Sequence, residues 1–192
     1  MSADRTLRPL ATAHSVVGFA TCACLLVFYA VGEPFGVIND LGNALLGALS
    51  LWLAWLLRPP ATAAARSPLS DLLLCVAGAG AALTATGTVL VLTGITGFYL
   101  AGLWSSLGFA LIGAWLVGVG RHTPSGGRSG LIAGLVMLLG LVGLPGIVMG
   151  LDDLDKAPAW TFVAGVNWAG TYLLFPAWSS RLAREDRPER LR

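Results

Sequence analysis

Three polar side chains lie close together near the start of a long apolar segment. Asn39, Asp40 and Asn43 belong to residues 32–60, which are apolar over most of their length. A carboxylate with amides beside it can bind a cation, a proton or an amine, and an ionisable group inside a membrane helix is a candidate functional residue. We therefore take these three residues as the centre of a predicted binding site.

A second polar position lies at a matching depth in the last apolar segment. Counted at 1.5 Å per residue, Asn43 and Asn167 both lie roughly 9 Å inside their segments. We expect the two amides to face each other, either as a polar clamp between helices or as the lining of a substrate or ion site. Trp168 lies deeper than most tryptophans of the chain, which fits a pocket wall or ordinary helix packing. The candidate binding residues are Asn39, Asp40, Asn43, Asn167, Glu33 and Trp168.

The acidic residues have structural alternatives. Asp40 falls in the first turn of the predicted helix, where a carboxylate interacts favourably with the helix dipole and can reach water. Glu33 and the run Asp152–Asp155 make one predicted face acidic. That face is either a vestibule that attracts cations, or acidic by default because its loops exclude arginine and lysine. The run lacks the glycine and the distal glutamate of a calcium loop.

No recognisable catalytic motif is present. The chain has no HExxH, CxxC, nucleophile elbow or P-loop ending, and Gly78-Ala79-Gly80 lies inside an apolar segment rather than after a strand. Cys22 and Cys24 point roughly 200° apart on a helix, so they cannot present both thiols to one metal ion. His14 is expected to be a packing residue. We predict no catalytic residue, no metal site and no cofactor, and an enzyme acting on lipid is the least favoured class.

Composition indicates which elements must position these residues. Hydrophobic residues make up 56% of the 192, charged residues only 11%, and the mean hydropathy is +0.76. A soluble domain usually has about 25% charged residues. The apolar runs have the roughly 20 residues needed to cross a ~30 Å hydrocarbon layer. We predict an all-α, polytopic integral membrane protein with six transmembrane helices arranged as three helical hairpins.

Loop charge predicts the orientation. The spans cover about 11–31, 37–57, 72–92, 98–119, 131–151 and 159–178 in one bundle, 1–192, that ends in a charged tail, 179–192. Every basic residue except Lys156 falls in the terminal segments or in the second and fourth loops. By the positive-inside rule both termini are then cytoplasmic, in a multi-pass plasma (inner) membrane protein. The abundance of alanine, glycine and arginine suggests a bacterial source.

Residue spacing also predicts which helix faces pack together. In the second span the polar and small residues share one half of the helix, which should face the bundle, whereas leucines and Trp52 occupy the other half. Pro145 should kink or break the fifth span. The tryptophans near the span ends, Trp52, Trp55, Trp115, Trp160 and Trp178, are expected to form interfacial belts.

Two functional classes remain. The first is a small transporter or channel-like protein with a polar pocket near the extracytoplasmic face, built around Asp40, Asn43 and Asn167. The alternative is a non-catalytic membrane subunit or scaffold of a larger membrane complex, which needs only the glycine-rich packing faces. The expected partners are the lipid bilayer and either a second copy of the chain or a larger complex. Nucleic acid is not an expected partner, because the net charge is only +2 and no basic face is concentrated.

Overall fold

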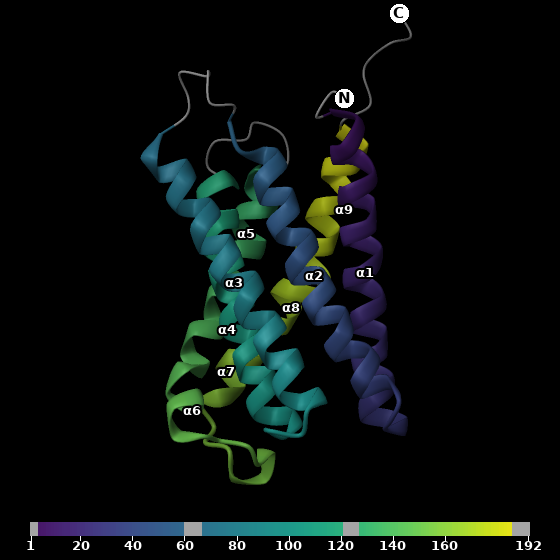
Figure 1. The fold of residues 1–192 in the computed structure, drawn as a ribbon, viewed down its shortest axis with the longest axis vertical. Coiled ribbons are helices and arrows are strands. Elements are labelled where there is room, and N and C mark those ends of the chain that lie inside the picture. The colour runs from purple at the N-terminus through teal and green to yellow at the C-terminus, as the bar shows by residue number, and fades with distance from the viewer. Residues whose placement is uncertain (1–3, 60–66, 121–126, 186–192) are drawn as a thin grey trace, which may run out of the picture.

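The computed structural model describes residues 4–59, 67–120 and 127–185, and within these ranges the chain is helical without a strand. Four unbroken helices come first: α1 (Asp4–Val31), α2 (Phe35–Leu57), α3 (Pro68–Leu92) and α4 (Phe98–Gly120). Shorter segments follow: α5 (Gly127–Met137), η1 (Leu138–Gly143), α6 (Leu144–Met149), η2 (Leu154–Lys156), α7 (Thr161–Gly165), α8 (Asn167–Ala169), η3 (Gly170–Leu174) and α9 (Phe175–Glu185). Figure 1 shows the long helices side by side along the long axis of the molecule.

Five described stretches are long and apolar enough to cross a membrane. They are Thr6–Val31, Phe35–Leu57, Pro68–Leu92, Phe98–Gly120 and Gly127–Met149. The prediction of an all-α fold is therefore confirmed for the described residues, and these five stretches have the length and hydropathy of membrane spans. The sixth predicted span, 159–178, is not one helix but is divided among α7, α8, the π-helical η3 and α9. The last of these continues through Glu185, so the first part of the predicted tail is helical.

The bundle has two distinct ends. Helix α1 begins and α9 ends at the same end, which we call the terminal end, and α2 and α4 also finish there (Figure 1). The turns after α1 and α3, and the segment 150–160, lie at the opposite end. Helix α2 therefore begins at the opposite end. Of the arginines used to predict orientation, Arg66, Arg121, Arg187, Arg190 and Arg192 fall outside the described residues.

Helix pairing follows the predicted hairpins. Helix α1 packs on α2, and α3 on α4, while α5 and η1 contact the segments of the divided last span. Further pairings close the bundle, since α2 also packs on α3, α4 on α5 and α1 on α9. The amino-terminal and carboxy-terminal helices are thus neighbours.

Glycines set the closest approach of α3 and α4. A Cβ atom on Gly80 would lie 2.5 Å from the carbonyl oxygen of Gly108, and a Cβ on Gly108 would lie 2.6 Å from the carbonyl oxygen of Gly80. The helix backbones therefore touch at this crossing, where no larger residue fits without displacing main chain. Small residues allow this kind of close packing between membrane helices, where burial of apolar surface supplies little driving force.

The predicted faces of α2 are confirmed. The polar and small residues predicted to face the bundle are buried: Asn39, Asp40, Asn43, Gly47, Ser50 and Ala54. Leu41, Leu45 and Trp52 on the other half are exposed. The helix presents one polar face to the bundle because its hydrophobic pattern has the helical period.

Two aromatic predictions are wrong. Trp115 and Trp178 are buried rather than interfacial, and their rings pack edge to face with centroids 6.3 Å apart. They belong to a core cluster with Phe175, whose ring stacks on Trp178 at 5.7 Å. End position alone does not place an aromatic residue at the interface, because a ring on the inner face of its helix is covered by neighbouring helices.

The predicted break near Pro145 is present and begins before the proline. Helix α5 ends at Met137, η1 continues as a 3₁₀ segment, and Pro145 occupies the first turn of α6. Proline has no N–H to donate to the preceding turn. The side chain of Asn167 donates a hydrogen bond to the carbonyl oxygen of Met137, where α5 gives way to η1. Such contacts from neighbouring helices make an irregular backbone tolerable inside a membrane.

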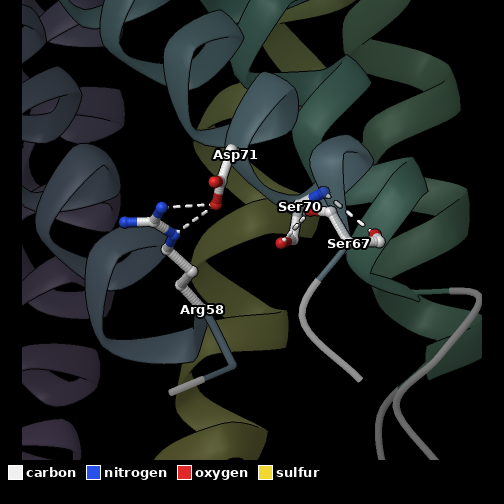
Figure 2. A network of polar contacts seen from close by, with 4 residues as sticks. All are labelled: Arg58, Ser67, Ser70 and Asp71. Carbon is white, nitrogen blue, oxygen red and sulfur yellow. Dashed lines mark hydrogen bonds and ion pairs between the residues drawn. The ribbon is translucent and has the colours of Figure 1, made fainter. Parts of the chain in front are cut away.

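An ion pair joins α2 to α3 at the terminal end (Figure 2). Arg58, which follows the last residue of α2, donates through Nε at 2.8 Å and through a terminal nitrogen to one carboxylate oxygen of Asp71. Ser67 caps α3 by accepting from the N–H of Ser70 at 3.4 Å. These residues border a cavity of about 500 Å³ between α2, α3 and α4. Its polar side chains Arg58, Ser67 and Ser70 already have protein partners.

We predict a modest stabilising role for this pair. Replacing Arg58 by methionine should lower the free energy of unfolding in detergent micelles by about 0.2–1 kcal/mol, because a partly exposed pair is weakened by solvent screening. The coupling is measured with a double-mutant cycle of Arg58→Met and Asp71→Asn in unfolding titrations. Additive effects of the two substitutions would show that the pair contributes nothing.

Candidate functional site

A small polar cavity lies between α2, α4 and the divided last span, in the half of the bundle away from the terminal end. Its volume is about 10 Å³, which is room for about one water molecule. We call it the Asp40 cavity. It is lined by Leu25, Asn39, Asp40, Asn43, Phe98, Gly102, Ser105, Ser106, Phe109, Trp168 and Tyr172. Four of the six predicted site residues, Asn39, Asp40, Asn43 and Trp168, are thus brought together.

Asp40 is a buried residue whose carboxylate has no hydrogen-bonding partner in the described part of the chain. It is 8% exposed, and no hydrogen bond or ion pair reaches its carboxylate from the described residues. Its main-chain oxygen accepts a hydrogen bond from Thr88 Oγ1 at 2.7 Å, which fixes α2 against α3. The backbone at Asp40 is therefore held in place while its side chain faces the cavity.

The helix-dipole explanation of Asp40 is wrong. Helix α2 begins at Phe35, two residues before the predicted start, and its first turn contains no acidic residue. The favourable effect of the dipole falls off within that turn. An unpaired buried carboxylate costs several kcal/mol when charged, so a side chain of this kind has a functional role as its default interpretation.

The two amides of the polar face form a chain of hydrogen bonds. Tyr172 donates its phenolic O–H to Asn43 Oδ1 at 2.6 Å, and Asn43 donates through Nδ2 to Asn39 Oδ1 at 3.4 Å. Asn39 donates in turn to the main-chain oxygen of Thr21 at 3.1 Å. The chain links η3, α2 and α1. It explains why both amides are buried, and it does not include the carboxylate of Asp40.

The predicted pairing of Asn43 with Asn167 is wrong. Asn167 is fully buried, and its Nδ2 donates to the main-chain oxygens of Ser106, at 3.3 Å, and of Met137. Its Oδ1 accepts from Thr171 Oγ1 at 3.0 Å. Similar depth in two spans did not bring the amides together, because Asn167 turns toward α4 and η1. Tyr172 takes its place as the contact between the last span and α2.

Glu33 and Trp168 have different positions relative to the Asp40 cavity. Glu33 is exposed, does not line the cavity, and accepts a hydrogen bond from the main-chain N–H of Val37 at 3.3 Å. It therefore acts on the first turn of α2. Trp168 does line the cavity, and its indole N–H donates to Ser106 Oγ at 3.2 Å.

An apolar pocket of about 220 Å³ adjoins the Asp40 cavity. It is lined by Tyr29, Phe98, Tyr99, Gly102, Leu103, Ser106, Leu154, Thr161, Phe162, Ala164, Gly165 and Trp168. Four of these residues also line the Asp40 cavity: Phe98, Gly102, Ser106 and Trp168. The two spaces therefore share a wall. The sequence did not identify Phe98, Gly102 or Tyr172 as site residues. Phe98 and Tyr172 are aromatic and Gly102 is a glycine, and in an apolar span residues of these types look like packing residues.

The acidic residues of segment 150–160 serve the fold. Asp152 accepts hydrogen bonds from the N–H groups of Gly97, at 2.5 Å, and Leu100, at 3.2 Å, and so caps α4. Asp153 accepts from Asp155 N at 3.0 Å and forms an ion pair with Lys156 at 2.8 Å. The hydrogen bond from Lys156 lowers the pKa of Asp153. These contacts give Asp152 and Asp153 structural roles in the segment.

A second buried polar cluster surrounds His14. Its Nδ1 lies 2.7 Å from Ser179 Oγ and its Nε2 lies 3.1 Å from Ser50 Oγ, so the ring joins α1, α2 and α9. Each serine oxygen is also within hydrogen-bonding distance of the main-chain oxygen one turn earlier. A neutral imidazole donates through one nitrogen only. One serine must therefore donate to the ring instead. The cluster fits the predicted packing role, although sequence did not identify its partners.

Metal binding has no candidate among the described residues, where no three histidine, cysteine, aspartate or glutamate side chains gather. Cys22, Cys24 and Cys75 are free thiols. Comparison with protein-family models, with curated proteins and with solved structures gives no match to this chain. The functional argument therefore depends on the geometry of the two adjoining spaces.

Proposed function

We propose that this chain is a small membrane transporter whose binding site is the Asp40 cavity and whose substrate is a small cation or a protonated amine. One observation carries the proposal: a buried carboxylate, with no partner among the described residues, faces a cavity inside a membrane bundle. A cation that enters the cavity would neutralise this carboxylate and so remove the cost of its burial.

The other walls of the cavity suit a cationic ligand. Phe98, Phe109, Trp168 and Tyr172 surround the space with aromatic rings. Ring faces attract cations, and the attraction is largest where water is excluded. Ser105 and Ser106 add hydroxyl oxygens that can accept a hydrogen bond from an ammonium group. No basic residue lines the cavity, so anions are excluded as ligands.

Loop charge supports an orientation for the site. With both termini on the cytoplasmic side of a plasma membrane, the Asp40 cavity lies in the extracytoplasmic half of the bundle. A substrate would then enter from outside. An active reporter fused after Arg192 that requires an extracytoplasmic environment would contradict this orientation.

The first test is equilibrium binding of radiolabelled methylammonium to the purified protein in nanodiscs, compared with Asp40→Asn. The substitution preserves the shape of the side chain and removes its charge. Hydrogen bonds to charged groups contribute about 1.5–3 kcal/mol, so the affinity should fall by roughly tenfold or more. Uptake of methylammonium into proteoliposomes should fall in parallel.

Asp152→Asn is the matched control. It makes the same chemical change at the same end of the bundle, in a carboxylate that caps α4. Asparagine is also a good capping residue, so methylammonium binding should stay unchanged. Equal binding by wild type and Asp40→Asn would reject the proposal, and so would an equal loss in both variants.

The tight interior favours a second candidate, a membrane scaffold or subunit. The Asp40 cavity has room for about one water molecule, and Leu46, Leu53 and Phe109 are buried in the core. A scaffold needs no passage through the bundle. It predicts no uptake of methylammonium by either variant, together with co-purification of a fixed partner in constant proportion.

A further inference from the structure

We propose that the Asp40 cavity and the adjoining apolar pocket form one composite site for an amphipathic amine. The ammonium group would lie at Asp40, and a short alkyl or aryl group would occupy the apolar pocket between α4 and α7. This inference rests on the proposed cation site and names the class of ligand that the site would select.

Gly102 lies in the wall that the two spaces share. It lines both of them, and a Cβ atom added there would meet Trp168 Cζ2 at 3.9 Å, with no closer heavy atom. The glycines of the α3–α4 crossing differ, since a Cβ on Gly80 or Gly108 would collide with main chain. Close packing therefore does not account for a glycine at position 102. Its missing side chain leaves space beside the indole of Trp168.

The apolar pocket presents an apolar wall even where its residues are polar. Thr161 donates its hydroxyl to the main-chain oxygen of Pro158 at 2.7 Å, and Ser106 accepts from the indole of Trp168. Phe98, Phe162 and Leu103 supply apolar surface. No acidic or basic side chain lines this pocket. A ligand with a charge at one end only therefore matches the two spaces together.

Size limits the apolar part of the ligand. The apolar pocket holds about 220 Å³, below the ~300–1,000 Å³ of sites for drug-sized molecules. A butyl or benzyl group is therefore a better match than a long chain. A lipid acyl chain could also fill the pocket, but it brings no positive charge to Asp40. Alcohols and amines of equal length distinguish these two occupants.

The composite site predicts a dependence on chain length. Straight-chain amines from methylamine to butylamine should displace radiolabelled methylammonium with an affinity that rises about fourfold per methylene, as expected for burial of a CH₂ group. Butanol should compete roughly tenfold more weakly than butylamine, because it lacks the charge-assisted contact. Measurements use the full chain in nanodiscs. Amine that partitions into the lipid is measured with the Asp40→Asn variant and subtracted from the wild-type signal.

Gly165→Leu tests the apolar pocket directly. Gly165 lines the pocket, and a Cβ there would meet no heavy atom within 4 Å, so a larger side chain can be added without a backbone clash. This variant should keep the wild-type affinity for methylammonium and lose the gain with chain length. Val163→Leu, an enlargement on the same helix at an exposed residue outside the pocket lining, should keep that gain.

The outcomes separate the two proposals. If Gly165→Leu retains the full chain-length gain, or butanol competes as well as butylamine, the composite site is wrong while the cation site stands. If methylammonium does not bind the wild-type protein at all, the cation site itself is wrong. Thermal unfolding of each variant in the same nanodiscs shows whether it is folded. If Gly165→Leu does not fold, Gly102→Val is a second substitution that blocks the composite site.

Discussion

Replacing Gly108 by alanine is expected to destabilise the bundle by roughly 1–3 kcal/mol, the usual cost of overpacking a closely packed interior. The added Cβ would lie 2.6 Å from the carbonyl oxygen of Gly80 and 2.7 Å from the main-chain nitrogen of Thr84. Both obstacles are backbone atoms of α3, so a side-chain rotation cannot relieve the contact. The two helices must separate, which weakens the largest helix–helix contact of the bundle.

Gly78→Ala is the matched control for this prediction. Gly78 lies on α3, and a Cβ there would lie 3.7 Å from its nearest neighbour, the side-chain carbon Leu51 Cδ1, which is an ordinary contact. Alanine is favoured over glycine in a helix by roughly 0.5–1 kcal/mol. The control should therefore be neutral or stabilising. Unfolding in detergent micelles, followed by circular dichroism, measures both variants, and equal stability of Gly108→Ala and wild type would rule out a tight crossing.

Replacing Asn167 by leucine is expected to lower the free energy of unfolding by about 1–2 kcal/mol. Interhelical hydrogen bonds in membrane proteins average about 0.6 kcal/mol. Asn167 makes bonds to three partners, and one of them is the Met137 carbonyl at the end of α5. Leucine has a similar size and cannot replace any of these bonds. The expected loss is therefore larger than the average for a single bond.

Thr171→Val isolates one bond of this set. It removes the hydroxyl that donates to Asn167 Oδ1 and keeps the shape of the side chain. We expect a loss no larger than the ~0.6 kcal/mol average for a bond between helices, because this bond joins two residues of the same span. Both variants are measured by unfolding in the same detergent. A smaller effect for Asn167→Leu than for Thr171→Val would contradict the role assigned to the amide at the junction of α5 and η1.

The sequence by itself determined the all-helical class, the apolar helices of membrane-spanning length and the inward face of α2. The length of the apolar runs predicts membrane spans, because the hydrocarbon layer has a defined thickness. The helical period places Asn39, Asp40 and Asn43 on one side of α2. That side is expected to be buried because the bulky apolar residues lie on the opposite side of the helix. Pro145 predicts a break in the fifth span, since its missing N–H cannot complete the helix.

Only the tertiary structure decided which inward-facing residues meet. Asn43 and Asn167 lie at similar depth, yet Asn43 binds Tyr172 while Asn167 binds main-chain oxygens of α4 and α5. Depth follows from counting residues along one helix. Contact between helices depends also on their relative rotation and on the local pitch, and the π-helical η3 changes both in the last span.

The same reason explains the remaining differences. Trp115 and Trp178 lie near the ends of apolar runs, but they face the core cluster rather than lipid. The wall at Gly102 that the Asp40 cavity shares with the apolar pocket needs α2, α4 and the divided last span to be in place together. The hydrophobic period of each helix can be read from the sequence alone. The packing of several helices decides what their faces enclose.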